Sequence, residues 1–256
     1  MNEYMVMQDI IEVGKRMYNR GFVAANDGNI SVKVSENEII ITPTGVSKGY
    51  MKIEDLIKVD LDGNVVSGNK RPSSEMKMHL EVYKNRPDVY AVCHAHPQKA
   101  TAFAVARQIC DKVALPEVIF SIGKLALSDY ATPSTEEVPK SISEIIKTAD
   151  AVLLANHGAL TVGSDVFDAY FKMETLEHYA SIILYARLLG GEVGLEPKQI
   201  RDLLKVRTEK FGKSDLGYYD EGYCGGRAIE ESETQELQEI IEQVVKETLE
   251  KLGASS

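Results

Sequence analysis

Apolar and polar residues alternate along parts of the first third of the chain with a period of two, which is typical of half-buried β-strands. Two of these stretches flank the turn Asp62-Gly63-Asn64, and this arrangement predicts a hairpin. Two later apolar runs are continuous, as is typical of strands that are buried on both faces. The predicted strands are residues 30–34, 38–42, 57–60, 65–66, 89–93 and 151–155.

Other stretches repeat their apolar positions with the period of an amphipathic helix. Gly21 and the pair Gly190-Gly191 follow two of them as stop signals. Ser73 or Ser74 is expected to cap one helix, with Glu75 in its first turn, and Ser134-Thr135-Glu136-Glu137 has the pattern of a capping box. Residues 113–127 are mixed in character and are expected to be extended. The predicted helices are residues 8–20, 76–84, 97–106, 134–148, 166–189, 200–210 and 234–252.

Strands and helices interleave along the chain, but the early hairpin is incompatible with a simple parallel winding of the sheet. The pattern therefore predicts an α/β fold with a mixed or antiparallel sheet packed between helices. No linker-like segment divides the chain. We expect residues 1–256 to form a single domain, with a tail and a terminal helix from about residue 211.

The overall charge limits the choice of partners. The 256 residues carry a formal net charge of −10 and no cluster of Lys and Arg, so nucleic acid and anionic membranes are not expected as partners. The cysteines Cys93, Cys110 and Cys224 show no C-x-x-C pairing, which indicates a reducing compartment. There is neither a signal-peptide pattern nor a long uncharged apolar run, and we expect a cytoplasmic protein.

Two histidines follow an apolar strand two residues apart. His94 and His96 would point to the same face of the sheet, so both imidazoles could bind one zinc ion. His157 follows another buried strand and could complete a three-histidine site with an open position, as in catalytic zinc sites. The alternatives are a hydrogen-bonded histidine pair and a turn histidine. His79 and His178 fall inside predicted helices and are interpreted as structural residues.

Three loops share small residues, hydroxyl or amide groups and free backbone donors: Gly28-Asn29, Thr44-Gly45 and Ser73-Ser74. Such loops could form a nest for a phosphate, particularly at a helix N-terminus. The alternative is that they are ordinary turns, which use the same residues. Glu75 is either a helix-start carboxylate or, beside a metal, a proton shuttle whose pKa is balanced between burial and the cation.

The order of six motifs resembles that in the class II sugar-phosphate aldolases. The resemblance extends from about Gln8 to Leu189. The motifs are Asn26-Asp27-Gly28-Asn29-Ile30-Ser31, Ile41-Thr42-Pro43-Thr44-Gly45, Arg71-Pro72-Ser73-Ser74-Glu75, His94-Ala95-His96-Pro97, Tyr130-Ala131-Thr132-Pro133 and Asn156-His157-Gly158. The resemblance implies a three-layer α/β/α sandwich with a largely antiparallel central sheet, usually in a ring-shaped homotetramer with active sites at subunit interfaces.

The resemblance also implies roles for individual residues. It implies one Zn²⁺ per subunit and acid–base work for Glu75. A tyrosine from the tail of a neighbouring subunit is also implied, and Tyr218, Tyr219 and Tyr223 are the candidates here. A second family tyrosine has no clear counterpart near Leu115-Pro116-Glu117. The implied zinc ligands are His94, His96 and His157, and the implied phosphate-binding residues are Gly28, Asn29, Thr44, Gly45, Ser73 and Ser74.

The implied reaction is the reversible cleavage of a ketose 1-phosphate, such as L-fuculose 1-phosphate, into dihydroxyacetone phosphate and an aldehyde. Three alternatives share the fold. A pentulose-5-phosphate 4-epimerase would carry Asp in place of Glu75, and a methylthioribulose-1-phosphate dehydratase would keep Glu. A non-enzymatic module resembling the adducin head would have no working metal site, whereas here all three histidines are present.

Overall fold

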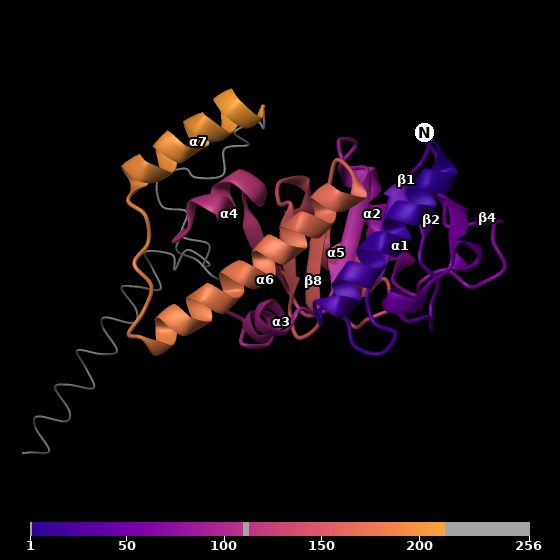
Figure 1. The fold of residues 1–256 in the computed structure, drawn as a ribbon, viewed down its shortest axis with the longest axis horizontal. Helices are drawn as coiled ribbons and strands as arrows, with labels where there is room; N and C mark the ends of the chain where they lie inside the picture. The colour runs from indigo at the N-terminus through magenta and orange to yellow at the C-terminus, as the bar shows by residue number, and fades with distance from the viewer. Residues whose placement is uncertain (1, 110–112, 213–256) are drawn as a thin grey trace, which may run out of the picture. The chain divides into compact units, whose positions relative to one another are not determined.

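The computed structural model describes residues 2–109 and 113–212, all within one compact unit. At its centre is an eight-stranded sheet in the order β4-β3-β2-β1-β5-β8-β7-β6 (Figure 1). Neighbouring strands are antiparallel except β6 and β7, so the predicted α/β fold with a largely antiparallel sheet is confirmed. The strands are β1 (Asn29–Lys33), β2 (Glu38–Ile41), β3 (Ile57–Asp60), β4 (Val65–Ser67), β5 (Ala91–Ala95), β6 (Leu125–Ser128), β7 (Ala151–Leu154) and β8 (Gly158–Gly163).

Two hydrophobic clusters pack against the sheet. One joins α1, α3 and α6 to strand residues such as Ile40, and the other joins α2 and α5 to residues such as Ile39. Successive strand residues point to opposite faces, so the clusters lie on opposite faces of the sheet. The helices are α1 (Glu3–Asn19), α2 (Met76–Asn85), α3 (Gln98–Val105), α4 (Pro116–Ser121), α5 (Glu137–Ile142), α6 (Val166–Leu188) and α7 (Pro197–Phe211), with short 3-10 turns η1 (Lys48–Tyr50), η2 (Ile53–Asp55) and η3 (Ile145–Lys147).

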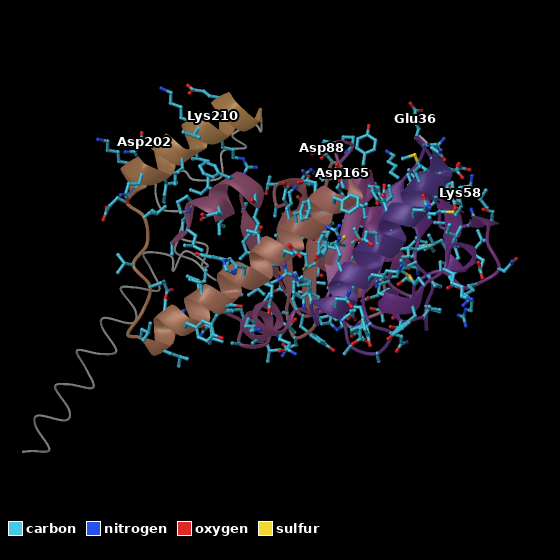
Figure 2. All side chains as sticks on the ribbon, viewed as in Figure 1. Glu36, Lys58, Asp88, Asp165, Asp202 and Lys210 are labelled. Carbon is cyan, nitrogen blue, oxygen red and sulfur yellow. The ribbon has the colours of Figure 1, made fainter. Side chains whose placement is uncertain are left out.

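Helices α1 and α6 lie side by side over one face of the sheet (Figure 1). Helix α7 packs on α4 through the buried side chains of Leu204 and Arg207, and Arg207 donates a hydrogen bond to the carbonyl of Ile119. The charged side chains of Asp202 and Lys210 project from the exposed side of α7 (Figure 2). Within the described residues, no helix is both long and apolar enough to cross a membrane.

The face of the sheet beneath α2 carries the polar residues of β1 and β5. Ile30 and Cys93 belong to the cluster on the α6 side, so Asn29, Ser31 and His94 point toward α2. Asn29 and His94 are also direct cross-strand neighbours in the β1–β5 ladder. His94 and His96 were expected to lie on one face of the sheet. This is the face covered by α2, and both histidines lie near Glu75 at the N-terminus of that helix.

Strand β8 was not predicted. The strand expected at 151–155 ends as β7 at Leu154, and the chain then turns through Asn156 and His157 into β8, all of whose residues are buried. Asn156 takes the left-handed conformation with φ of 56°, which Asn tolerates well in tight turns. β8 pairs with both β5 and β7, so this turn brings His157 to the end of β5.

Residues 113–127 were expected to be extended. The structure instead forms helix α4 in this segment, before β6. Pro116 occupies the first turn of α4, where its missing N–H leaves no hydrogen bond unmade. The first helix begins at Glu3 instead of residue 8, because the Asn2 side chain accepts a hydrogen bond from the N–H of Tyr4.

The predicted helix 134–148 is confirmed only in part, and its capping box is wrong. The chain forms α5 and then the separate 3-10 turn η3, while Ser134 adopts φ of 64° outside the helix. Thr135 Oγ1 accepts from the N–H of Glu137, and the Glu137 carboxylate accepts from the N–H of Thr132. These bonds stabilise a turn before α5. The predicted helix 234–252 lies outside the described residues.

The predicted serine cap of α2 is also replaced by a different arrangement. Glu75 is itself the N-cap residue, and its side chain makes no capping hydrogen bond. Ser73 Oγ accepts from the N–H of Glu75 at 3.3 Å, which fixes the turn before the helix. The carboxylate of Glu75 is therefore not engaged with the backbone of α2 and extends toward β1 and β5.

Candidate active site

A cavity of about 230 Å³ lies where the loops before β1, after β2 and before α2 meet the β7–β8 turn. All six predicted phosphate-binding residues line it, together with Glu75, His96 and His157. His94 is fully buried and lies against His96 and His157. The tertiary structure thus brings every predicted site residue among the described ones to one place, while Tyr218, Tyr219 and Tyr223 lie outside the described residues.

The imidazoles of His94, His96 and His157 form a compact triangle. Their ring centroids are 5.0 Å (His94–His96), 4.8 Å (His94–His157) and 5.2 Å (His96–His157) apart. One nitrogen from each ring lies within 4.8 Å of the other two. A Cβ at Gly158 would come within 2.5 Å of the His96 ring and 2.6 Å of the carbonyl of Ala95, so glycine is required beside the triangle.

A hydrogen bond orients one of these rings as a metal ligand. His94 Nδ1 donates to the carbonyl of Ala159 at 2.9 Å, which turns Nε2 toward His96 Nε2, 3.2 Å away. His96 Nδ1 lies 3.5 Å from Asp27 Oδ2, within ion-pair distance. Burial and the charges of His94 and His157 lower the pKa of His96 to about 4, which favours the neutral ring that a metal requires.

Three converging imidazole nitrogens fit a divalent cation such as zinc, and fewer than four protein ligands leave room for a substrate. His79 and His178 are not part of this group among the described residues. His178 lines a separate cavity between α6 and α4.

Glu75 bridges two of the histidines. Its Oε2 lies 3.2 Å from His94 Nε2 and its Oε1 3.1 Å from His157 Nε2. Burial alone would raise the pKa of Glu75, but the charges and hydrogen bonds of His94 and His157 outweigh it and hold the pKa well below its ordinary value. Without a metal, Glu75 is therefore a carboxylate beside the candidate metal ligands, and the expected balance between burial and a bound cation stays a prediction.

A buried chain of hydrogen bonds extends from Glu75 into the core. Asn29 Nδ2 donates to Glu75 Oε2 at 2.8 Å, and His79 Nε2 lies 2.5 Å from Asn29 Oδ1. Ser31 Oγ lies 2.7 Å from His79 Nδ1 and 2.8 Å from the Tyr83 hydroxyl. We call this series of hydrogen bonds, from Glu75 through Asn29, His79 and Ser31 to Tyr83, the relay. One neutral tautomer of His79 satisfies all of its bonds.

The directions of the relay follow from Asn29. Because its amide nitrogen donates to Glu75, its Oδ1 must accept from His79 Nε2. His79 Nδ1 then accepts from the hydroxyl of Ser31, which accepts from Tyr83. Burial, together with the charge of His94, lowers the pKa of His79 to about 3, so the ring stays neutral. No local spacing indicates these contacts, because His79 meets Asn29 and Ser31 of β1, about 50 residues away in the chain.

Three loop N–H groups at the cavity, those of Gly28, Gly45 and Ser74, make no hydrogen bond within the described part of the chain. Gly28 and Gly45 both have φ of 73°, the left-handed conformation that turns N–H groups into concave nests. The N–H groups of Thr44 and Ser73, in contrast, donate to the carbonyls of Arg71 and Thr42.

Free donors from separate loops at one cavity are an arrangement suited to an anion. The sequence pattern had not indicated Asn26, Asp27, Pro133 and Ser134 as lining residues of the same cavity, nor the relay residues Ser31, His79 and Tyr83. Asp27 and Pro133 stand inside two of the six motifs, which is the signal that could have identified them.

The sequence profile of the family described as Class II Aldolase and Adducin N-terminal domain matches residues 8–184. A protein of Methanococcus maripaludis named L-fuculose phosphate aldolase is 36% identical over 178 residues, which cover 70% of this chain and 96% of that protein. A protein of Haemophilus influenzae named 3-oxo-tetronate 4-phosphate decarboxylase is 33% identical over 199 residues, covering 76% of this chain and 93% of that protein.

A solved structure named L-fuculose 1-phosphate aldolase superposes on this chain with a TM-score of 0.73 and 33% identity, covering 81% of this chain and 96% of that one. The part of the chain that matches the family profile contains the cavity and all three histidines.

Proposed function

Since the chain belongs to the class II aldolase and adducin N-terminal domain family and is an enzyme of the aldolase and lyase type, we propose that it is a metal-dependent aldolase. It reversibly cleaves a ketose 1-phosphate, such as L-fuculose 1-phosphate, into dihydroxyacetone phosphate and an aldehyde. The observation that supports this best is the position of Glu75, beside three imidazoles and in the same cavity as three loops with free N–H groups.

Each part of the cavity has a task in this reaction. His94, His96 and His157 hold one Zn²⁺ per subunit, and when bound this ion polarises the substrate carbonyl and stabilises negative charge on its oxygen. The loops at Gly28-Asn29, Thr44-Gly45 and Ser73-Ser74 bind the phosphate through N–H and hydroxyl donors. One amide proton of Asn29 is committed to Glu75, so Asn29 offers the phosphate its second amide proton.

Glu75 moves the proton at the carbon that is cleaved. In retro-aldol cleavage the C4 hydroxyl loses its proton, the C3–C4 electron pair forms the enediolate, and C3 then takes up a proton. Glu75, protonated from solvent, delivers this proton to C3, and in the reverse direction the ionised carboxylate removes it. A tail tyrosine, Tyr218 or Tyr219, accepts the proton of the C4 hydroxyl, whose oxygen becomes the aldehyde oxygen, and passes it to solvent. No lysine Schiff base takes part.

A second candidate is decarboxylation of a 3-oxo-tetronate 4-phosphate, favoured by the relative that carries this name at 33% identity. In both substrates the carbon next to the ketone carries a hydroxyl group, and the bond from this carbon to the departing carbon breaks. Both reactions therefore leave the enediolate of dihydroxyacetone phosphate. The difference is the departing group. An aldehyde leaves only after its hydroxyl has lost a proton, whereas a carboxylate leaves as CO₂ without help from a base.

The deciding experiment incubates the zinc-loaded protein with a panel of ketose 1-phosphates and with 3-oxo-tetronate 4-phosphate. Because dihydroxyacetone phosphate is a product in both cases, the aldehyde and CO₂ are measured separately. An aldolase releases an aldehyde in equal amount to dihydroxyacetone phosphate. Release of CO₂ with no aldehyde from any ketose would replace the first proposal by the second. Turnover of neither substrate class would contradict both.

The proposal extends to the assembly of the protein. We propose a cytoplasmic homotetramer of single-domain subunits, each a three-layer α/β/α sandwich, with a tail from about residue 211 that reaches a neighbouring active site. The two hydrophobic clusters on opposite faces of the sheet support the layered arrangement. The test is the molecular mass in solution over a range of dilutions, measured together with activity.

A further inference from the structure

Lys48 is a buried cation beside the candidate active site. Its residue is 1% exposed, and its ammonium group donates to the carbonyls of Asn26 at 3.0 Å and Val46 at 2.6 Å. No carboxylate of the described residues lies within ion-pair distance of it, which is unusual because buried charges are generally paired. Gly14 of α1 makes this burial possible, since a Cβ there would come within 2.7 Å of the Lys48 carbonyl.

The two carbonyls that Lys48 binds belong to two of the three loops at the cavity. Asn26 lies two residues before Gly28, and Val46 directly follows Gly45. Gly28 and Gly45 carry free N–H groups in the left-handed conformation. One ammonium group therefore ties together the loops that present these donors, and it neutralises carbonyl dipoles that would otherwise oppose an anion.

The described lining of the cavity contains the imidazoles of His96 and His157 but no Lys or Arg, and it contains the carboxylates of Asp27 and Glu75. A phosphate dianion placed there would be repelled by these two carboxylates, and in the proposed site a zinc ion at the histidines would offset part of this repulsion. Lys48 is the buried positive charge in contact with the loops that line the cavity.

We propose that Lys48 is a positioning residue for phosphate binding, which holds the Gly28 and Gly45 loops together and supplies the positive charge behind them. This inference rests on the proposed function, because it assumes that the cavity binds the phosphate of the substrate. Burial lowers the pKa of Lys48, the charge of Asp27 opposes this shift, and the net result is a pKa of about 8. A bound dianion favours the charged ammonium form, so ligand and lysine stabilise each other.

The test compares Lys48→Met and Lys48→Gln with the parent protein, all loaded with zinc. Methionine keeps the length of the side chain and removes the buried charge, which costs free energy to desolvate. Glutamine keeps an N–H donor without the charge. Lys52→Met is the matched control, because its side chain is exposed and contacts Glu54 outside the cavity. Metal content and thermal unfolding verify the state of each variant.

Four quantities are measured for each protein. They are kcat and KM for the ketose 1-phosphate, and the inhibition constants of inorganic phosphate and of acetohydroxamate, a metal chelator without a phosphate. In both Lys48 variants we expect KM and the phosphate constant to rise roughly tenfold or more, the scale of one charge interaction in a partly buried site. We expect kcat to fall less than this, and the acetohydroxamate constant to stay unchanged. Lys52→Met should resemble the parent protein throughout.

Other outcomes overturn the inference in distinguishable ways. Equal phosphate inhibition in the parent and both Lys48 variants removes any role in phosphate binding while the proposed function stands. A joint loss of phosphate and acetohydroxamate binding, or a variant that does not fold, assigns Lys48 to packing alone. A parent protein that neither binds phosphate nor cleaves any ketose 1-phosphate overturns the proposed function and this inference together.

Discussion

Asn29 donates a hydrogen bond of 2.8 Å to the carboxylate of Glu75, 46 residues further along the chain. The other end of the same amide accepts from His79, so Asn29 is fixed between a helix residue of the core and the candidate acid–base group. Neither bond can be inverted without placing two donors or two acceptors together. The orientation of Glu75 therefore depends on the buried relay beneath it.

The first prediction concerns His79. His79→Phe removes the donor to Asn29 Oδ1, so the amide can flip and Glu75 loses its fixed partner. We expect kcat to fall roughly 10–100-fold, the scale seen for partners of active-site ligands, with zinc content retained. His79→Gln keeps an N–H donor and should recover part of the loss. Equal activity of the Phe and Gln variants would show that His79 only fills space.

The second prediction concerns Glu75. Glu75→Gln keeps the size of the side chain but cannot carry the proton, so turnover should fall by roughly 10²–10⁴-fold while zinc content and phosphate affinity persist. Exchange of the C3 proton of dihydroxyacetone phosphate with solvent should fall in parallel, because it needs the same base and no aldehyde. Exchange at the parent rate in a folded, zinc-loaded variant would place the base elsewhere.

The third prediction concerns the metal. The purified protein should hold about one zinc or similar divalent ion per chain, and His94→Ala should lose both the ion and turnover. Metal analysis and activity after chelation and zinc addition are the measurements. His178→Ala is the matched control, because His178 lies outside the three-histidine group, and it should keep its metal. Full activity at zero metal content would falsify the metal-dependent route.

The fourth prediction concerns the tail tyrosines. Replacing the acting tail tyrosine, by Tyr218→Phe or Tyr219→Phe, should reduce aldol cleavage by roughly 10²–10⁴-fold. Proton exchange into dihydroxyacetone phosphate should persist, since it involves no aldehyde. Both rates are measured on the same preparation. If neither variant alters aldol cleavage, we expect Tyr223 to act, and an unchanged Tyr223→Phe variant would exclude the tail from the chemistry.

The fifth prediction concerns stability against pH. In the folded protein burial lowers the pKa of Lys48 from its ordinary 10.5 to about 8. Between these values the unfolded chain binds more protons than the folded one, so the free energy of unfolding rises with pH. The slope from one such group is at most about 1.4 kcal/mol per pH unit. Denaturant unfolding from pH 8 to 10.5 should show this rise relative to Lys48→Met. Parallel curves would mean that the lysine is not perturbed.

Much of the site follows from local rules. A period of two along a strand is enough to place His94 and His96 on one face, and the structure has them on the face beneath α2. Loops rich in Gly, Asn, Ser and Thr are recognisable from their residues, and Gly28 and Gly45 do adopt the left-handed conformation that glycine accepts most readily. The long helix α6 can also be predicted from the sequence, because Asp165 caps its N-terminus and Gly190-Gly191 follow its C-terminus.

Only the tertiary structure brings these pieces together. No periodic pattern predicted strand β8. Because β8 pairs with β5, the turn before β8 lies at the end of β5, and His157 in this turn reaches the other histidines. Asn29 meets His79 across the interface of sheet and helix, and the ammonium of Lys48 joins two loops through the carbonyls of Asn26 and Val46. Local propensities act over a few residues, whereas these contacts depend on strand order and on the packing of distant segments. The sequence therefore determined which groups the site contains, and the fold determined their distances and partners.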